Sequence, residues 1–376
     1  MNVDNIRNLF PHIKKNINYL NHASRGPLCT PVIDSLNKAI DEQSSEQIDN
    51  YQSFLETMEE TRELIGEMLN TKSNRISFLD NTTNGINVIA NGIKWKRGDR
   101  VLLNDIEFPA NVYPFLNLRS EGVEVDFIKS QNGIIPADKI IEAIKPATRL
   151  VSISYVQFLS GYRADLEIIG KVCREKGVIF SVDAIQALGA VNLDVEKCNI
   201  DFLSCGSQKW LLGLQGFAFI FVAVNLQEKM QPKNIGWLSV ENAWDLLHYD
   251  LKLKSSALTF QGGTVNNFGV NALNSSLKLF FEFGLKNIES NVISNSRYII
   301  SKLNELGYSS SLSDLGDNNI AGIISFPHPD ANKVYQHLAK EKIFISAREG
   351  YVRISPHFYN TLGEFDYLIS ELKKLG

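Results

Sequence analysis

The residues that most clearly point to chemistry are a lysine and an acid placed at the ends of apolar runs. Lys209 follows the run 202–205 and precedes a second one at 217–222. Asp183 ends the run 178–182. A buried lysine or carboxylate is costly unless it is paired or used. Either residue alone is most simply a solvated group at the end of a strand. A site is indicated only if other functional residues are expected beside them.

A short polar segment, 81–85, provides such residues. Asn81-Thr82-Thr83-Asn84-Gly85 lies between a strand-like and a helix-like run. Hydroxyls and free N–H groups at a helix N-terminus bind phosphate. An ordinary N-cap explains one threonine but not the whole segment. An acid, a phosphate cradle and a lysine are what a pyridoxal phosphate site requires, and Phe108 offers an aromatic face for the ring.

The elements that would position these groups form an alternating pattern. Apolar runs alternate with helix-like segments at 76–79, 101–103, 123–128, 150–155, 178–182, 202–205 and 217–222. Several runs are apolar on both parities, which is typical of strands covered on both faces. We therefore predict an α/β fold in which a large domain holds a mainly parallel seven-stranded sheet.

The flanking regions predict helices and a second, smaller unit. Helices are expected from Thr30-Pro31 and across 54–68, and long helices across 267–306. An α+β pattern follows, with strands at 320–326 and 352–355 and helices at 330–340 and from Leu362. The predicted organisation is an N-terminal segment (1–25) near the active site and small domain, a large cofactor-binding domain (26–260), and interdomain helices with a small C-terminal domain (261–376).

Composition limits the partners. The 376 residues are 44% apolar and 21% charged, with a net charge of −4 and no basic block, which argues against nucleic acid and anionic membranes. Residues 1–7 lack the features of a signal peptide, and the longest apolar run, 217–224, is far shorter than the ~20 residues that span a bilayer. We expect a cytoplasmic protein without membrane contact.

Other cofactor classes lack their signatures. The four cysteines have no C-x-x-C spacing and the six histidines are scattered, so neither a disulfide framework nor a metal site is expected. No G-x-G-x-x-G follows a strand near the start of the sheet, which disfavours a dinucleotide-binding fold.

Seven motifs, taken in order, make the pattern specific. They are Thr82-Thr83-Asn84-Gly85, Glu107-Phe-Pro-Ala-Asn111, Ser154-Tyr-Val-Gln-Phe158, Val182-Asp-Ala-Ile-Gln186, Ser207-Gln-Lys-Trp210, Gly263-Thr264 and the segment 352–361. With them the chain resembles the fold-type I pyridoxal phosphate enzymes of the class V aminotransferase group. That group includes cysteine desulfurases, selenocysteine lyases, isopenicillin N epimerase and kynureninase. The resemblance runs from Tyr19-Leu-Asn-His22 through the last motif and covers essentially the whole chain.

The resemblance implies a role for each cofactor-binding residue. Lys209 is the Schiff-base lysine, and Asp183 pairs with the pyridine nitrogen. Thr83 and its neighbour Thr82 hold the phosphate. Either Gln157 or Gln186 reaches the 3-oxygen of the ring.

Further contacts follow from the same resemblance. Phe108 covers the ring, and Ser207 and Gln208 join the cofactor-binding set, with Gln208 where many relatives have histidine. On the substrate side, Arg353 matches the arginine that grips the substrate carboxylate, a bidentate task, and His22 is assigned beside it. Thr264 matches a loop that reaches the neighbouring subunit's phosphate, which implies a homodimer with shared active sites.

Departures from the family pattern bear on the reaction. In cysteine desulfurases a loop before the carboxylate-binding arginine carries a catalytic cysteine, whereas here residues 345–351 contain none. Gln157-Phe158 replaces the asparagine that often follows the Ser154 strand in relatives. We therefore expect chemistry at the amino group or α-carbon of an amino acid, with an aminotransferase-type reaction favoured.

Two alternatives stay open. One is a cysteine desulfurase-like or selenocysteine lyase-like C–S or C–Se lyase. The other is an isopenicillin N epimerase-like epimerase or a kynureninase-like lyase. A non-enzymatic protein that keeps the fold is disfavoured by the intact set of Lys209, Asp183 and Arg353.

Overall fold

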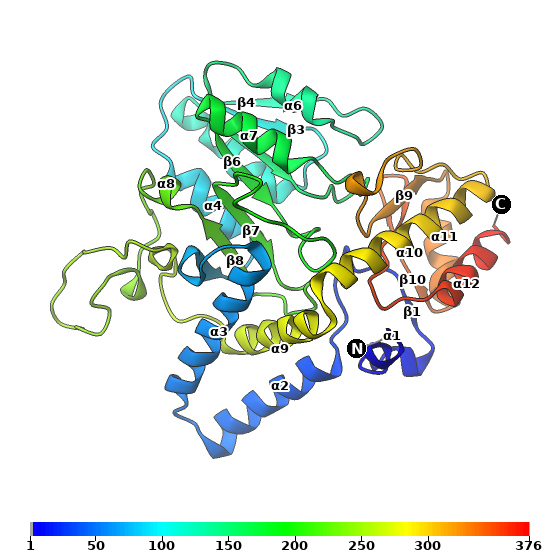
Figure 1. Ribbon diagram of the computed structural model, residues 1–376, viewed down its shortest axis with the longest axis horizontal. Coiled ribbons are helices and arrows are strands. Elements are labelled where there is room, and N and C mark those ends of the chain that lie inside the picture. The colour runs from blue at the N-terminus through cyan, green and yellow to red at the C-terminus, as the bar shows by residue number, and fades with distance from the viewer. Residues whose placement is uncertain (1–2, 376) are drawn as a thin grey trace.

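The computed structural model describes residues 3–375 and shows a large sheet with helices on its faces beside a smaller unit (Figure 1). The sheet has seven strands in the order β2-β8-β7-β6-β5-β3-β4. Their bounds are Ile76–Leu79 (β2), Arg100–Asn104 (β3), Glu124–Ile128 (β4), Thr148–Ser154 (β5), Ile179–Asp183 (β6), Phe202–Gly206 (β7) and Ala218–Val222 (β8). All seven predicted strands are present, with ends shifted by at most two residues.

Strand direction explains where Lys209 lies. β4, β3, β5, β6 and β7 run parallel, whereas β8 is antiparallel to both β7 and β2. Antiparallel neighbours can be joined by a short connection, while parallel ones need a long crossover. The short connection from β7 to β8 carries Lys209 and therefore holds it close to the carboxyl end of β7.

Both faces of the sheet are buried. On β5, Leu150 packs in one apolar cluster while Val151 and Ile153 pack in another. Helix α4 (Thr82–Gly92) contributes to the first cluster, and α7 (Leu166–Lys176) to the second. The apolar residues on both parities of the strands therefore serve two helical layers, as predicted.

Three long helices pack together below the sheet in Figure 1 and lead to the smaller unit. Helix α9 (Asn267–Phe283) packs against α2 (Thr30–Asp41) and α3 (Tyr51–Leu69). Pro31 occupies the first turn of α2, where its missing N–H costs nothing. Helix α10 (Leu285–Glu305) continues from α9 toward the C-terminal residues.

The smaller unit contains a three-stranded antiparallel sheet in the order β11-β12-β9. Its strands are β9 (Ile324–Pro327), β11 (Ser346–Arg348) and β12 (Tyr351–Ile354), covered by α11 (Ala331–Lys340) and α12 (Leu362–Leu372). The strand expected at 320–326 is shorter than predicted. Thr361 and Glu364 form a capping box that starts α12.

The N-terminal segment lies against this smaller unit. β1 (Asn18–Tyr19) pairs in parallel with β10 (Ile343–Phe344), and α1 (Val3–Arg7) is tied to α12 by an ion pair between Arg7 and Glu364. The remaining helices are α5 (Tyr113–Asn117), α6 (Ala137–Ala143) and α8 (Val224–Gln227). The domain boundaries at residues 26 and 261 stay a prediction.

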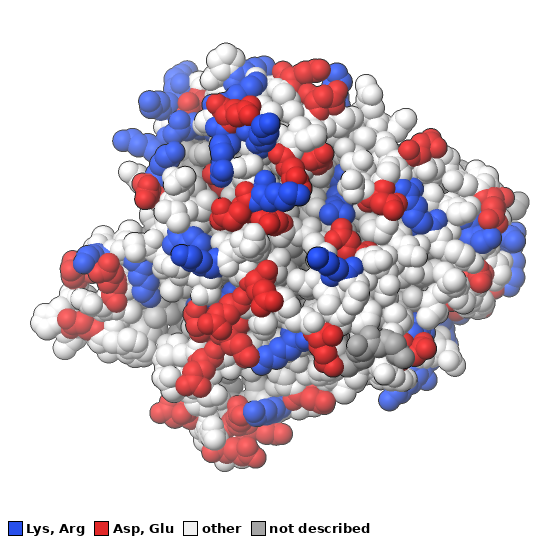
Figure 2. Space-filling view, in the orientation of Figure 1, with Lys and Arg blue, Asp and Glu red and all other residues white. Residues whose placement is uncertain are grey.

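Acidic and basic side chains are interspersed on the face shown in Figure 2. Among residues 3–375, no helix combines the length and apolarity that a membrane crossing needs.

Candidate functional site

The predicted residues converge on one edge of the large sheet. Asp183 ends β6, Lys209 follows β7, Gln157 follows β5, and Glu107 follows β3. Thr82 begins α4 directly after β2. Carboxyl ends of parallel strands meet at the same edge, which is where open α/β sheets bind ligands.

Asp183 and Lys209 have altered acidities. Asp183 is 2% exposed, and its Oδ1 accepts a hydrogen bond of 3.0 Å from the Ile185 N–H. Burial raises the pKa of Asp183 to about 6. Burial also lowers the pKa of Lys209 to about 8, against the opposing effect of the Asp183 carboxylate. A lysine with this pKa has an appreciable neutral fraction near pH 7, which a nucleophilic amine needs.

Other parts of the chain lie very close to the lysine loop, the connection 207–217 that carries Lys209. A Cβ on Gly26 would lie 2.2 Å from the Lys209 carbonyl oxygen. A Cβ on Gly189, whose φ is +95°, would lie 2.4 Å from the carbonyl oxygen of Trp210. On Gly322 it would lie 2.3 Å from the Trp210 ring. Three distant segments thus approach this loop as closely as only glycine permits.

The start of α4 forms a polar recess. The Thr82 hydroxyl is buried and has no hydrogen-bond partner among residues 3–375. A Cβ on Gly206 would lie 3.1 Å from Thr82 Oγ1 and 2.5 Å from Gln208 Oε1. Asn81 caps the helix by accepting a 2.8 Å hydrogen bond from the Asn84 N–H, and Thr83 is exposed beside it. An unpartnered hydroxyl, a helix N-terminus and a missing side chain fit a phosphate group.

The two glutamines left open by the sequence differ in the structure. Gln157 Nε2 donates to Glu107 Oε1 at 3.0 Å, while its own Oε1 is buried and has no partner within the described part of the chain. Gln186 is bonded at both ends, because its Nε2 donates to the Ala23 carbonyl at 3.0 Å and its Oε1 accepts from Trp210 Nε1 at 2.9 Å. Gln157 is therefore the better placed of the two for a cofactor contact.

Glu107 is a residue that sequence reasoning left without a role. Its buried carboxylate accepts hydrogen bonds from the Ser154 N–H at 2.8 Å and from Asn111 Nδ2 at 3.1 Å, besides that from Gln157. It fixes the orientation of the Gln157 amide. The only sequence feature that could have indicated this role for Glu107 is its position in the motif 107–111.

Phe108 lies where a ring cover is expected. The Lys209 Nζ is 5.7 Å from the centroid of the Phe108 ring. Phe158 packs edge-to-face on Phe108 with ring centroids 5.3 Å apart. The lysine thus faces an aromatic wall.

Arg353 is a buried cation held by neutral groups. Its Nε donates to Ser346 Oγ at 3.1 Å, its Nη1 to the Phe158 carbonyl at 2.7 Å, and its Nη2 to Ser24 Oγ at 2.9 Å. The residue is 1% exposed, and burial lowers its pKa to about 9. It forms no ion pair within the part of the chain described. Because a buried charge is stable only when paired, the site fits an incoming carboxylate. Neither serine was expected from the sequence.

Two side chains with predicted ligand contacts, His22 and Ser207, already have hydrogen-bond partners within the chain. His22 is fully buried, with Nδ1 2.9 Å from the Ser355 carbonyl oxygen and Nε2 2.7 Å from the Tyr359 hydroxyl, so neither nitrogen is free for a substrate. The Ser207 hydroxyl lies 2.8 Å from the Leu214 carbonyl oxygen and is used to hold the lysine loop. Both side chains were assigned to ligands because they adjoin motifs, but local packing occupies them. Thr264 is exposed, and its contact with a neighbouring subunit stays a prediction.

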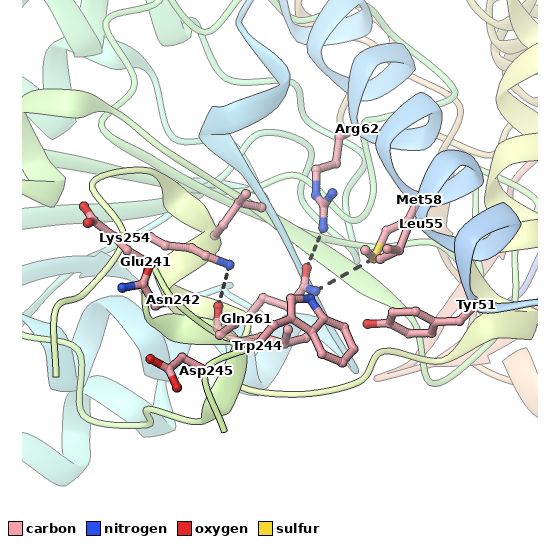
Figure 3. Close-up of a pocket in the computed structure, with 13 residues that line it drawn as sticks. Tyr51, Leu55, Met58, Arg62, Glu241, Asn242, Trp244, Asp245, Lys254 and Gln261 are labelled. Atoms are coloured by element: carbon pink, nitrogen blue, oxygen red, sulfur yellow. Dashed lines mark hydrogen bonds between the residues drawn. The ribbon is translucent and has the colours of Figure 1, made fainter. Parts of the chain in front are cut away.

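A separate hollow lies between α3 and the segment 238–261. Its volume is about 640 Å³, and its lining includes none of the predicted site residues. Figure 3 shows Arg62 Nη2 donating to Gln261 Oε1 at 2.8 Å, with Trp244 and Tyr51 at one side. This hollow is a feature of the surface near the segment 244–251 and not part of the lysine site.

Comparison with known proteins identifies the family. The model of the family described as aminotransferase class-V matches residues 18–368. The chain belongs to the class V aminotransferase family. It is therefore a pyridoxal phosphate-dependent enzyme, a transferase or a lyase, and pyridoxal phosphate is its cofactor.

Two curated relatives of this class V enzyme are similar over nearly their whole length. A probable cysteine desulfurase of Methanothermobacter thermautotrophicus is 26% identical, with 100% of this chain and 98% of the relative covered. An uncharacterised aminotransferase of Bacillus subtilis, YcbU, is 25% identical, with 97% and 96% covered.

Solved structures of low identity establish the fold. The apo cysteine desulfurase of Thermococcus onnurineus superposes with a TM-score of 0.89 at 22% identity, covering 99% of this chain and 97% of that one. The cystine C–S lyase C-DES, in complex with its reaction product cysteine persulfide, gives a TM-score of 0.87 at 22% identity, covering 96% and 98%. The class V enzyme has the fold-type I architecture predicted from its sequence.

Proposed function

We propose that this class V enzyme is a lyase that breaks the C–S bond of a cysteine-derived amino acid without a protein thiol. Its curated relatives include probable cysteine desulfurases, and one structural neighbour is named a cystine C–S lyase. These similarities favour the sulfur alternative over the aminotransferase-type reaction that the sequence put first.

The observation that carries the proposal is the state of the cysteines. Cys29, Cys173, Cys198 and Cys205 are all buried, at most 7% exposed. Burial raises the pKa of Cys173 and of Cys198 to about 12. A sulfur-accepting thiol must be accessible and readily ionised. None of the four qualifies, so the sulfur must leave with the group that it already carries.

The residues present fit the cofactor. Thr82, Gly206 and Gln208 would hold the phosphate, with Thr83 beside them. Asp183 would pair with the pyridine nitrogen, Gln157 would reach the 3-oxygen, and Phe108 would cover the ring. When bound, pyridoxal phosphate withdraws electrons from the α-carbon of an amino acid.

The remaining steps belong to side chains of this enzyme. Arg353 binds the α-carboxylate and so fixes the orientation of the α-carbon. The neutral amine of Lys209 takes the α-proton onto Nζ. The electron pair of the Cα–H bond forms a Cα–Cβ double bond as the Cβ–S bond breaks. The sulfur group leaves with that bond's electrons and is protonated, and addition of water to the three-carbon fragment gives pyruvate and ammonia.

A homodimer with shared sites is part of the proposal. The segment 244–251 exposes large apolar side chains, with Leu247 80% and Tyr249 91% exposed. It projects as a long yellow-green loop at the left of Figure 1. Exposed apolar surface of this kind is typical of an interface. The segment shortly precedes Thr264 in the chain, which is the residue expected to reach the partner's phosphate.

The test compares products of the holoenzyme. With L-cystine as substrate we expect pyruvate and ammonia in equal amounts, together with a persulfide in solution and none on the protein by mass spectrometry. The Cys29→Ser variant should keep the native rate. Alanine formed from cysteine with a persulfide on a protein cysteine would instead indicate a desulfurase. Transfer of the amino group to a 2-oxo acid would indicate an aminotransferase.

A further inference from the structure

Arg353 lies on the second strand of a short hairpin formed by β11 and β12. β11 and β12 are joined by Glu349 and Gly350 alone, with φ of +49° and +78°. Two successive positive φ values define the tight turn that best matches strand twist. Where a desulfurase would need a mobile loop bearing a cysteine, this chain has a tight hairpin without one.

The register of this hairpin determines which side chains share a face. Ser346 pairs with Arg353, and Arg348 pairs with Tyr351. Directly opposed residues point to the same side of a sheet, as do residues two apart on one strand. Arg348 therefore lies on the same face as Ser346 and Arg353, about 7 Å along the strand from Ser346.

That face is the substrate side. Ser346 Oγ accepts the 3.1 Å hydrogen bond from Arg353 Nε, so the face carries the carboxylate-binding arginine. Arg353 is buried, whereas Arg348, nearer the turn, is exposed. The two arginines thus lie on the same face of the sheet, Arg353 buried and Arg348 near the solvent.

The charge of Arg348 acts on the site but has no counterion. Arg348 forms no ion pair with any residue from 3 to 375. After burial, its positive charge is the next cause that lowers the pKa of Arg353, and it also lowers that of Lys209. An unpaired arginine beside two other cations is unfavourable unless an anion joins them.

We propose that Arg348 determines specificity by binding a second carboxylate, at the far end of the substrate side chain. The inference rests on the proposed function and narrows its substrates to sulfur-linked amino acids with a carboxylate at each end, of which L-cystine is one. Arg353 holds the α-carboxylate of the half that is cleaved, and Arg348 holds the carboxylate of the half that departs. A planar guanidinium at an exposed rim suits bidentate binding of such a group.

The kinetic test uses the holoenzyme with Arg348→Gln, Arg348→Lys and the exposed control Arg119→Gln. L-cystine carries two carboxylates and S-methyl-L-cysteine one. Arg348→Gln should raise KM for L-cystine about tenfold, leave kcat within twofold, and leave S-methyl-L-cysteine unaffected. Arg348→Lys should fall between, and Arg119→Gln should match the native enzyme. Equal losses for both substrates, or no loss for either, would overturn the proposal.

A binding test separates this inference from the proposed function. 2,7-Diaminosuberate replaces both sulfurs of cystine by carbon, so it keeps the two carboxylates and cannot undergo C–S cleavage. Its binding, followed by the absorbance of the bound cofactor, should weaken about tenfold in Arg348→Gln, while that of norleucine should not change. That pattern would support the role of Arg348 even if no C–S bond were cleaved. Equal binding of diaminosuberate by the native and Gln forms would refute it even if cystine were cleaved.

Discussion

The point that a Cβ on Gly206 would occupy lies 3.1 Å from the unpartnered hydroxyl oxygen of Thr82. A methyl group there would fill part of the recess proposed for the phosphate. It would also crowd Gln208 Oε1 at 2.5 Å and Ile185 Cδ1 at 3.2 Å, and both atoms are the far ends of side chains that can move away. The backbone of β7 should therefore tolerate alanine even though the recess does not.

We expect Gly206→Ala to fold normally and to bind pyridoxal phosphate at least about tenfold more weakly, because it removes space from the anion site. Affinity is measured by titrating the cofactor-free protein, and stability by thermal unfolding. Gly363→Ala, an exposed helix position with nothing within 4 Å, is the matched control and should raise stability by about 0.5–1 kcal/mol. Native cofactor affinity in Gly206→Ala would refute the assigned recess.

The acidity of Lys209 predicts how cofactor capture depends on pH. The neutral amine is the nucleophile, and the pKa of Lys209 is lowered to about 8 by burial. The rate of capture should therefore rise with pH up to about 8 and level off above it. Stopped-flow absorbance measures this rate. Lys209→Ala should show no covalent cofactor after borohydride reduction and a turnover lower by at least about a hundredfold. A rate that keeps rising to pH 10 would contradict the shifted pKa.

Asp183 should make cofactor binding sensitive to acid. Because burial raises its pKa to about 6, the carboxylate of the cofactor-free protein is charged only above that pH. Binding that relies on this charge should be complete above pH 7 and weaken as the pH falls through 6. Asp183→Asn should lose this dependence and turn over about a hundredfold more slowly, because no anion stabilises the pyridinium. An Asn variant with native turnover would remove Asp183 from the proposed mechanism.

Dimerisation should depend on the exposed segment 244–251. We expect the double variant Leu247→Asp, Tyr249→Asp to sediment as a monomer and to bind the cofactor more weakly, since charges would oppose burial of that segment. Ile168→Asp, which replaces an apolar residue 50% exposed on α7, serves as the control and should sediment as the native protein does. If the double variant remained dimeric, the segment 244–251 would not form the dimer interface.

The strands, and the positions of Asp183 and Lys209 at the ends of two of them, could be predicted from the sequence because their signals are local. Strands buried on both faces are apolar on both parities, and Asp183 and Lys209 follow two of them directly. The recess at Thr82 could be predicted for the same reason, because a helix start after a strand is a short-range feature.

Contacts made across the chain could not be predicted in this way. No sequence pattern predicts that Ser24 and Ser346 would accept hydrogen bonds from Arg353. Nor does the sequence show that the His22 ring would bond to the Tyr359 hydroxyl, or the Ser207 hydroxyl to the Leu214 carbonyl. In the hairpin that carries Arg348, the second strand was predicted at 352–355, but β11 was taken as part of a loop, because three residues are too few for periodicity to show.

The hydrogen bonds that Arg353 donates also have a consequence for the order in which the site forms during translation. Its acceptors on Phe158 and Ser24 are separated from it by 195 and 329 residues of chain. Ser24 leaves the ribosome early and must wait for nearly all of the chain before it meets its partner. The lysine and the phosphate recess lie well before Arg353 in the chain, so a growing polypeptide acquires the parts that hold the cofactor before those that hold an amino acid. Completion of the last hairpin is thus the step that makes the site competent for its substrate.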